Sequence, residues 1–273
     1  MDKSCPACQG QFKQFAVFPK HLIYKCSNCG LGCTTNIGKQ VGDYHRDEVY
    51  IKEEARFSNI FLRRVKLVNT LTKSKGKILD IGSSTGLMLS LFKQEGWEVR
   101  GVEMSQKAAQ FATKRGIETE ITAFEQARLA NRSLDAVIIN HTLEHLEHPQ
   151  SVLHKISDVL KTDGVLLIDV PNFGSLSAQL RRGNWPYLLP DEHLWHFTAE
   201  ALTLMLKKEG LIVVSRTSPS GIWDYSSPGS ELLSALFGLK KRFFSQMLTF
   251  IPDYFISFLN MGTSLTIVAK KND

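Results

Sequence analysis

The segment from residue 77 to residue 90 constrains the fold of this chain more than any other. It reads KILDIGSSTGLMLS, in which an apolar strand ends near Ile81 and a helix opens directly after Gly86. Gly82 and Gly86 carry no Cβ, so a ligand can approach the backbone of the turn, and the first N–H groups of the helix face the same space. The segment therefore predicts a strand, a turn and a helix built around a ligand.

Two acidic residues indicate what kind of ligand this turn binds. Asp80, at the end of the strand, would repel a pyrophosphate but attract an ammonium group. A second strand ends at Glu103, where both carboxylate oxygens can accept hydrogen bonds from the two hydroxyls of a ribose. A dinucleotide site would instead have a G-x-G-x-x-G turn for the pyrophosphate. The two acids favour a cofactor that joins an amino acid to a nucleoside.

The DIGSSTG turn at residues 80–86, followed by Glu103 at the end of the next strand, resembles the first two motifs of class I S-adenosylmethionine (SAM)-dependent methyltransferases. A βαβ unit without a cofactor would not require this order of strand, acid, turn, helix, strand and acid. The resemblance implies that SAM binds through residues in and beside these motifs, namely Asp80, Gly82, Ser83, Ser84, Gly86, Glu103, Met104, Asn140 and His141.

Strand and helix patterns alternate from residue 77 to the last residues of the sequence. Strands are expected near 77–81, 97–103, 117–121, 134–140, 164–170, 211–215 and 264–269, and helices near 86–95, 105–115, 149–160 and 198–209. This pattern predicts an α/β fold with a doubly wound, Rossmann-like, seven-stranded sheet. The resemblance adds the strand order 3-2-1-4-5-7-6 with an antiparallel last strand, and Asp80, Glu103 and Asn140 would then share one rim.

Four of the five cysteines lie in two C-x-x-C turns, Cys5 to Cys8 and Cys26 to Cys29. Each turn directs two thiolates at one point, so the two turns together complete a tetrahedral four-sulfur site. The hairpin expected between them is too small to fold without a metal. Two disulfides are the alternative, which a reducing compartment disfavours. We therefore predict a zinc ribbon with a structural metal, and Cys33 as a packed thiol outside that site.

The chain is expected to divide into a zinc ribbon at 1–42, a linker helix at 43–72 and a SAM-binding methyltransferase domain at 73–273. At the end of the ribbon, polar and Gly-containing residues predict a linker from 34 to 42. In the helix, apolar residues recur at helical spacing from Phe57 to Val68, so one face should pack on the sheet. Arg63 and Lys66 lie between them and predict a solvated basic face.

The strand expected at 134–140 runs into Asn140-His-Thr-Leu-Glu-His-Leu-Glu-His148, the densest cluster of ionisable groups in the chain. His141, Glu144 and His145 match the H-x-x-E-H pattern of zinc proteases, but that pattern requires a helix, and here it follows a core strand. The resemblance places Asn140 and His141 beside the methionine part of SAM, where a second positive charge on His141 would be unfavourable. His145 is then a candidate general base, with a loop-holding role for Glu144 and His145 as the equal alternative.

A second polar cluster, at residues 185–197, reads WPYLLPDEHLWHF. Two prolines fix a loop there, and the resemblance places a substrate lid at this point. Tyr187, His193 and Trp195 are expected to bind the substrate, and His193 is the second candidate for the general base. His196 is expected to contribute to the start of the following helix rather than to chemistry.

The stretch from 229 to 260 is expected to be a helical insertion before the last strand. It carries six phenylalanines and few charges outside the run Lys240-Lys-Arg242. We favour the interpretation that its helices cover the mouth of the site or form a homodimer face. Contact with a membrane surface is the alternative, with phenylalanines in the lipid boundary and the basic run on headgroups.

The composition limits the size of the core, the expected location of the protein and its expected partners. With 273 residues, 43% of them hydrophobic and 22% charged, the chain can bury one large core plus an appendage. No secretory signal pattern and no apolar run approaching the roughly 18 residues of a spanning helix is found, so we expect a cytoplasmic protein, at most peripheral to a membrane. A net charge of +6 is only a hint of a polyanionic partner.

These observations predict a SAM-dependent methyltransferase that acts on a small metabolite, a sugar-type or cyclic hydroxylated compound, at oxygen or carbon. An enzyme that methylates ribosomal-RNA bases and binds RNA through its zinc ribbon is the first alternative. It is disfavoured because Asn140-His-Thr-Leu stands where amino-group methylation needs a Pro-Pro-aromatic motif, and because every cysteine lies between residues 5 and 33, which leaves no nucleophile for pyrimidine methylation. A non-enzymatic binding module is the second alternative, against which the intact Asp80 and Glu103 count.

Overall fold

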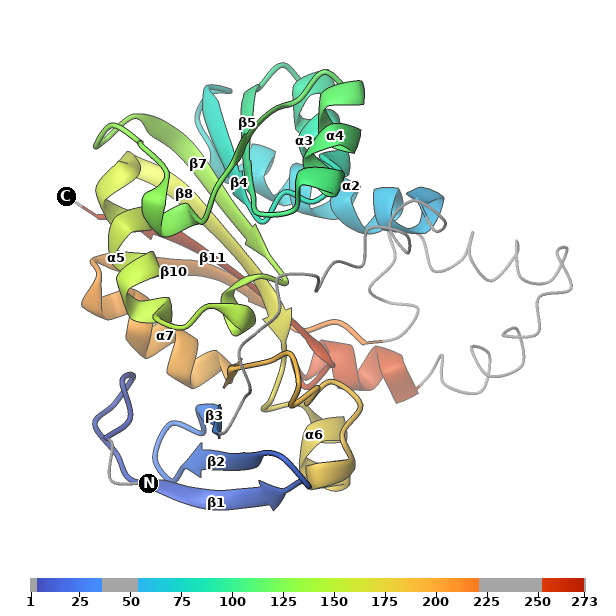
Figure 1. Ribbon diagram of the computed structural model, residues 1–273, viewed down its shortest axis with the longest axis vertical. Coiled ribbons are helices and arrows are strands. Elements are labelled where there is room, and N and C mark those ends of the chain that lie inside the picture. Colours follow the sequence, from blue (N-terminus) through green and yellow to red (C-terminus); the bar gives the residue numbers. More distant parts are fainter. Residues whose placement is uncertain (1–3, 36–53, 221–251, 273) are drawn as a thin grey trace, which may run out of the picture.

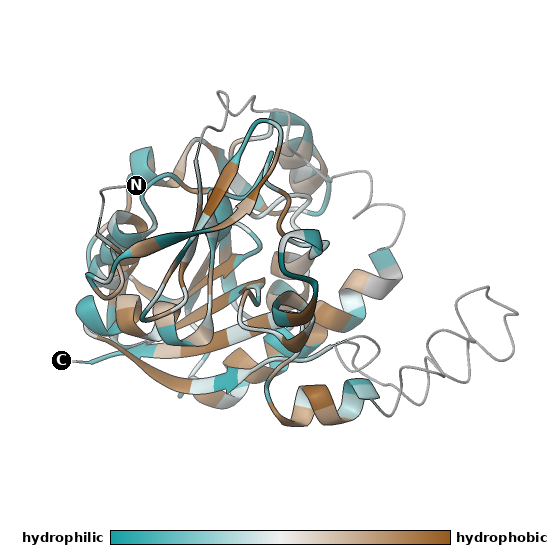
Figure 2. Ribbon diagram, turned by 90° about the horizontal axis from the view of Figure 1, so that it is seen from below, coloured by the Kyte–Doolittle hydropathy of each residue, from teal (hydrophilic) through white to brown (hydrophobic). Residues whose placement is uncertain are grey.

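The structure is a computed structural model that describes residues 4–35, 54–220 and 252–272 (Figure 1). A seven-stranded sheet runs through the middle of these residues, with helices on both of its faces. A four-stranded sheet, which includes the N-terminal strands, lies at the bottom of the view. Figure 2 shows that the helices carry hydrophobic residues along one side, as expected for helices that pack on a sheet.

The large sheet has the strand order predicted for it. Its strands are β4 (Lys77–Ile81), β5 (Glu98–Glu103), β6 (Glu118–Ile121), β7 (Leu134–Asn140), β8 (Leu160–Pro171), β10 (Leu211–Thr217) and β11 (Ser264–Lys271). They are arranged as β10-β11-β8-β7-β4-β5-β6. β11 runs antiparallel to both of its neighbours, whereas the pairs from β8 to β6 are parallel. Numbered from β4 and read from β6, the order is 3-2-1-4-5-7-6, which confirms the prediction.

The central strands are buried on both faces, which explains their continuous apolar sequences. Val137 of β7 and Leu166 of β8 on one face, and Ile138 and Leu167 on the other, are fully shielded from solvent. The covering helices are α2 (Glu54–Leu71), α3 (Leu87–Gln94) and α4 (Gln106–Lys114) on one face, and α5 (Pro149–Val159) and α7 (Ala199–Lys208) on the other. The four helices expected beside the strands are thus confirmed, with each end within one residue of its expected place.

Helix α2 packs against the sheet with the face predicted from its spacing. Phe61, Val65 and Val68 are buried in the core between α2, α3 and the strands, and Phe57 and Ile60 pack against the edge of that core. Residues 43–53 of the expected helix lie outside the described residues.

The N-terminal segment forms the hairpin expected between the two C-x-x-C turns. It consists of β1 (Phe12–Val17) and β2 (Leu22–Cys26), and β3 (Gly32–Thr35) and β9 (Trp195–His196) extend it into one antiparallel sheet. Thr34 and Thr35 therefore lie in a strand and not in the linker expected from residue 34. The reason is a tertiary contact, since the backbone N–H of Thr34 donates to the carbonyl of Leu194 at 2.9 Å.

The sequence patterns do not indicate several short elements. These are α6 (Leu176–Arg181) and the 3-10 turns η1 (Phe124–Gln126), η2 (Leu143–His145) and η3 (Arg182–Asn184). Of the insertion expected at 229–260, the structure describes a helix at 252–258, and the basic run and four of the six phenylalanines lie outside the described residues. Tyr254, Phe255 and Phe258 of this helix are exposed. No helix in the described ranges is long and apolar enough to cross a membrane.

Candidate functional site

The turn after β4 adopts a backbone conformation that favours glycine. Gly82 and Gly86 have φ angles of 74° and 72°. A Cβ on Gly82 would lie 2.3 Å from Oγ1 of Thr142, and a Cβ on Gly86 would lie 2.9 Å from the Cβ of Ala112. The two glycines are therefore required by close packing within the chain itself. Close packing is thus a second reason for glycine at these two positions, beside the expected approach of a ligand to the backbone.

Asp80 is a buried carboxyl group at the end of β4. Its side chain is 2% exposed, and its Oδ1 has no hydrogen-bond partner among the described residues. Burial, together with the nearby charge of Glu103, raises the pKa of Asp80 well above its usual value. A buried polar atom without a partner is costly, so a cationic donor bound at this point would stabilise the site. The arrangement suits an ammonium group.

Glu103 is held at the same turn from the end of β5. Its two carboxylate oxygens accept hydrogen bonds from the backbone N–H groups of Ser84 and Ser105, each at 2.8 Å. A carboxylate has about four acceptor sites, so these two bonds fix its orientation and leave it able to accept from further hydroxyls. Glu103 therefore fits the role of a ribose-binding residue.

A hollow lies over the turn, and its walls come from β4, the start of α3, α2 and the end of β7. It is lined by Phe61, Asp80, Gly82, Ser83, Ser84, Thr85, Leu87, Met88 and Asn140. Its volume of about 20 Å³ has room for about one water molecule. The walls therefore have to separate when a nucleoside cofactor enters, although the chemistry of the lining fits the amino-acid part of SAM.

The carboxyl ends of β4, β5 and β7 lie along one rim of the sheet. Paired residues near these ends bring Asp80, Glu103 and Asn140 together at that rim. Asn140 lines the hollow, whereas Met104 is 62% exposed beside it. His141 follows with a φ of 50°, and its backbone N–H donates to the carbonyl of Asp169 at 2.8 Å. The backbone thus turns sharply where β7 leaves the rim.

Glu144 lies at the centre of a group of histidines. It is 1% exposed, and its Oε1 lies 3.3 Å from Nδ1 of His141. Burial would raise the pKa of Glu144, but His141, His145 and His193 lower it to about 2. Burial would lower the pKa of His141, but Glu144 raises it above its usual value. The buried carboxylate next to His141 thus acts against the effect of burial on this ring.

His145 and His193 lie against each other, with ring centroids 4.8 Å apart. Nδ1 of His145 is 3.0 Å from the backbone oxygen of Glu192, and Nδ1 of His193 is 3.0 Å from that of Tyr187. A carbonyl only accepts hydrogen bonds, so Nδ1 carries the proton in each neutral ring and Nε2 carries the lone pair. Burial lowers the pKa of His193 to about 4, so this ring is neutral near pH 7. It can therefore accept a proton from a bound molecule.

The same group of side chains also has the geometry of a possible metal site. Potential ligand atoms of Glu144, His145 and His193 lie within 4.8 Å of one another, a spacing at which they could hold a metal ion. The H-x-x-E-H stretch itself is not an α-helix, since residues 143–145 form the 3-10 turn η2. The zinc-protease arrangement is therefore not formed by His141 and His145.

The loop at residues 185–197 contacts both the sheet domain and the N-terminal sheet. Tyr187 is 45% exposed. Trp195 lies in β9, and its Nε1 donates to a backbone carbonyl at 3.4 Å. His196 is buried at 2.8 Å from Oγ1 of Thr34, and burial lowers its pKa to about 3. The side chain that caps α7 is that of Thr198 and not that of His196. Trp195 and His196 thus take part in the contact between the loop and the N-terminal sheet.

Sequence reasoning missed two buried acids beside these groups. Glu192, next to His193, is 8% exposed, and burial raises its pKa. Asp169, at the end of β8, is fully buried and accepts a hydrogen bond from Nε of Arg64 at 2.7 Å. The signal for this ion pair is the position of Arg64, an arginine on the apolar face of α2.

The four cysteines of the two turns form one cluster. The Sγ atoms of Cys5 and Cys29 lie 3.5 Å apart, as do those of Cys8 and Cys26, and all four lie within 4.8 Å of one another. These distances are far longer than a disulfide bond of about 2.05 Å. Sulfurs that share a tetrahedral zinc ion at about 2.3 Å are about 3.8 Å apart. The donor set and its spacing therefore fit zinc.

The surroundings of the cluster lower the pKa of one of its cysteines, Cys26. Burial would raise the pKa of Cys26, but hydrogen bonds from the backbone of Cys29 and Asn28 lower it to about 7. Burial raises the pKa of Cys5, and it raises that of Cys33, which lies in β3 outside the cluster, to about 12. Metals bind the thiolate form, so the lowered pKa of Cys26 favours metal binding by this cysteine.

Two characterised relatives are similar to parts of this chain. The C-methyltransferase NovU of Streptomyces niveus is 30% identical over 142 residues, which cover 50% of this chain and 33% of that protein. The ubiquinone biosynthesis O-methyltransferase of Alkalilimnicola ehrlichii is 28% identical over 156 residues, which cover 50% of this chain and 63% of that protein. This chain thus spans less than two thirds of the length of either relative.

Solved structures share the fold. A SAM-dependent methyltransferase from Archaeoglobus fulgidus superposes with a TM-score of 0.58 at 22% identity and covers 84% of this chain and 100% of its own. A second one, from Mesorhizobium loti, has a TM-score of 0.52 at 17% identity and covers 76% of this chain and 96% of its own. At these identities the likeness establishes the fold alone.

A family profile described as "Methyltransferase domain" matches residues 50–216. This range is more than half of the chain, and it contains the turn after β4, the acids at the rim and the histidines around Glu144. The chain therefore belongs to the methyltransferase-domain family, on the fold of class I SAM-dependent methyltransferases.

Proposed function

We propose that this protein transfers the methyl group of SAM to a small metabolite, a sugar-type or cyclic hydroxylated compound, at oxygen or carbon. One observation carries the proposal: the residues that line the hollow and the histidine group around Glu144 adjoin each other at the rim. Asn140 lines the hollow over the turn, and the next residues along the chain form the histidine group around Glu144. The names of the two relatives, one a C- and one an O-methyltransferase, support both options for the acceptor atom.

Asp80 and Glu103 are the residues that would hold the cofactor. The buried Asp80 would bind the ammonium group, and Glu103 would accept hydrogen bonds from the ribose hydroxyls. When bound, SAM supplies a methyl group already activated on a sulfonium. The chain has then to align the acceptor and to accept one proton from it.

His145 and His193 are the groups we assign to the proton. In each ring Nε2 is the atom with the lone pair, because Nδ1 faces a backbone carbonyl. Glu144 lies close enough to both rings for them to lower its own pKa, so by reciprocity its charge stabilises a ring that has gained a proton. Tyr187 and Trp195 are proposed to contact the acceptor from the same loop.

Replacing Glu103 by alanine is expected to weaken binding of SAM, and of its demethylated product SAH, by on the order of 30-fold, since hydrogen bonds to a charged acceptor contribute about 1.5–3 kcal/mol. Calorimetric titration with SAH measures this. Glu98→Ala, at the exposed start of the same strand, is the matched control and should change the affinity by less than about twofold. An undiminished affinity in the Glu103→Ala protein would refute the assignment of this residue.

Labelled methyl groups from SAM are expected to appear in hydroxylated metabolites and not in RNA. The groups placed at the rim are carboxylates, an amide and histidines, whereas a phosphate backbone is bound by an extended basic stripe interleaved with aromatic residues. A panel of sugars, sugar nucleotides and cyclic hydroxylated compounds, with total RNA as a further acceptor, tests this against heat-killed protein. Transfer to RNA above that control would overturn the proposal in favour of the RNA-base alternative.

We further propose that Cys5, Cys8, Cys26 and Cys29 hold one zinc ion. Four thiolates leave no open position on the metal, so its role is structural. The cluster supports this proposal because its sulfur spacing fits one tetrahedral ion.

A further inference from the structure

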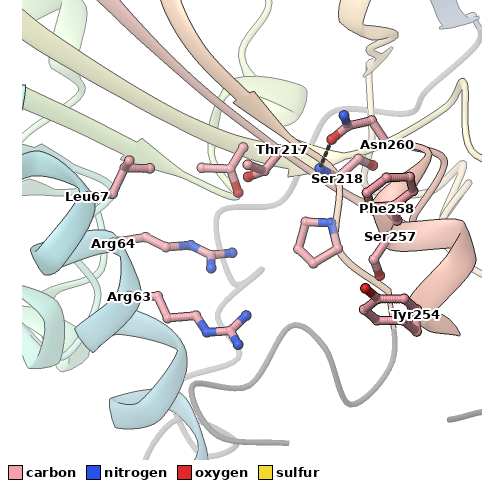
Figure 3. Close-up of a pocket in the computed structure, with 11 residues that line it drawn as sticks. Arg63, Arg64, Leu67, Thr217, Ser218, Tyr254, Ser257, Phe258 and Asn260 are labelled. Carbon is pink, nitrogen blue, oxygen red and sulfur yellow. Dashed lines mark hydrogen bonds between the residues drawn. The ribbon is translucent and has the colours of Figure 1, made fainter. Parts of the chain in front are cut away.

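A cavity of about 390 Å³ lies between α2 and the helix at 252–258 (Figure 3). This volume is within the range of small-molecule sites. Arg63 and Arg64 extend into the cavity from α2, and Tyr254 and Phe258 lie on its opposite side. Thr217 and Thr266, from β10 and β11, close its inner end. On the face of α2 predicted to be basic and solvated, Lys66 is exposed, and Arg63 is half-buried and also lines this cavity.

The lining carries two arginines on one side and two aromatic rings, with the polar side chains of Ser257 and Asn260, on the other. Two of the lining residues are arginines, and none of the described lining residues is acidic. Each guanidinium has five N–H donors in a planar fork, so it can bind an oxyanion in addition to the partners it already has. Across the cavity, the rings of Tyr254 and Phe258 are stacked with centroids 6.4 Å apart and offer an apolar surface.

Arg64 is held in position by a buried network. Its Nε donates to Oδ2 of Asp169 at 2.7 Å, and its Nη2 contacts the same oxygen. The hydroxyls of Ser264 and Thr266 donate to Asp169 at 2.8 and 2.9 Å. Asp169 is fully buried, so this guanidinium is fixed before any ligand arrives and loses little freedom on binding.

The cavity is adjacent to the rim that we assign to SAM. Phe61, which lines the hollow over the turn, is one helical turn before Arg64 on α2. Asp169 connects the two sites, because its carbonyl accepts from the backbone of His141 while its carboxylate binds Arg64. A molecule bound in the cavity would therefore lie next to the rim.

We propose that this cavity binds an oxyanion group, a phosphate or a carboxylate, of the methyl acceptor. Arg63 and Arg64 would bind the oxygens, and Tyr254 and Phe258 would contact the neighbouring ring or apolar part. This inference rests on the proposed methyl transfer. It restricts the acceptor to anionic compounds and names the residues that select them.

Three probes test the proposal: phenyl phosphate, benzoate and the neutral phenol. The intact protein, with SAH present, is expected to bind at least one of the two anions more tightly than phenol by about tenfold or more. Arg63→Ala should remove this preference, with Arg63→Lys intermediate because lysine lacks the planar fork. Lys66→Ala, an exposed change on the same helix, is the control and should leave anion binding within about twofold. Tighter binding of phenyl phosphate would identify a phosphate acceptor, and tighter binding of benzoate a carboxylate.

The affinity for SAH separates failure of this inference from failure of the proposed function. If SAH binds but the anions bind no better than phenol, or bind equally well to the Arg63→Ala protein, the oxyanion site is refuted and methyl transfer stands. If SAH itself does not bind the intact protein, the proposed function fails and the inference fails with it. Retained SAH binding by Arg63→Ala also shows that this variant is folded.

Discussion

Turnover by His145→Gln or His193→Gln protein is expected to fall by about 10²–10⁴-fold if that ring accepts the proton, the range typical of general-base catalysis. SAH binding should remain unchanged, because neither ring lines the hollow over the turn. Initial rates with an acceptor found by the panel, together with SAH titrations, measure the two effects. The loss in turnover should exceed tenfold in at least one of the two proteins.

A histidine on the surface provides the control. His154 on α5 has a side chain 67% exposed and lies 2.7 Å from Glu209, so His154→Gln should leave turnover within about twofold. If neither His145→Gln nor His193→Gln loses more than a few fold, alignment alone accounts for methyl transfer. The two rings would then serve only to hold the loop through the carbonyls of Glu192 and Tyr187.

The pH profile tests whether His193 is the base. A base is active in its deprotonated form, so the rate is constant above the pKa of the base and falls below it. Burial lowers the pKa of His193 to about 4, so if His193 is the base, activity should persist through neutral pH and decline only near pH 4. A decline near neutrality would therefore contradict His193 as the base.

The order of strands and helices could be predicted because the burial of each element determines its pattern of apolar residues. β7 and β8 contain the apolar runs 136–139 and 165–168, and a strand buried on both faces favours such a run. The turn at Gly82 and Gly86 could be located for a related reason, since two positive φ angles beside close packing exclude other residues.

Contacts between distant segments could not be predicted. β9 is only two residues long and exists because Trp195 and His196 pair with β3, which no local pattern encodes. The cavity beside Arg63 has the same origin, since α2 and the helix at 252–258 are far apart in the sequence. Burial of these particular polar groups, and with it the low pKa of His193, depends on the same long-range packing.

The N-terminal sheet contacts the loop at residues 185–197 directly. β9 within that loop pairs with β3, and Oγ1 of Thr34 lies 2.8 Å from Nε2 of His196. The hydroxyl of Thr198 donates to the carbonyl of Cys29 at 2.7 Å, which joins the second C-x-x-C turn to the start of α7. Cysteines of the cluster belong to the same hydrophobic core as α5 and α7. A change in the metal cluster should therefore reach the loop that carries His193.

Removal of zinc is accordingly expected to lower turnover by about 10²-fold, since a displacement of about 1 Å in a catalytic group can have that effect. SAH binding should be retained, because the turn after β4 and the acids at the rim belong to the large sheet. Cys26→Ser protein should lose both the metal and turnover, whereas Cys33→Ser, a change in a buried cysteine outside the cluster, should keep one zinc per chain. Metal analysis, SAH titration and initial rates decide the matter, and added zinc should restore activity to chelated protein. Full turnover in metal-free protein would show that the loop holds its position without the ribbon.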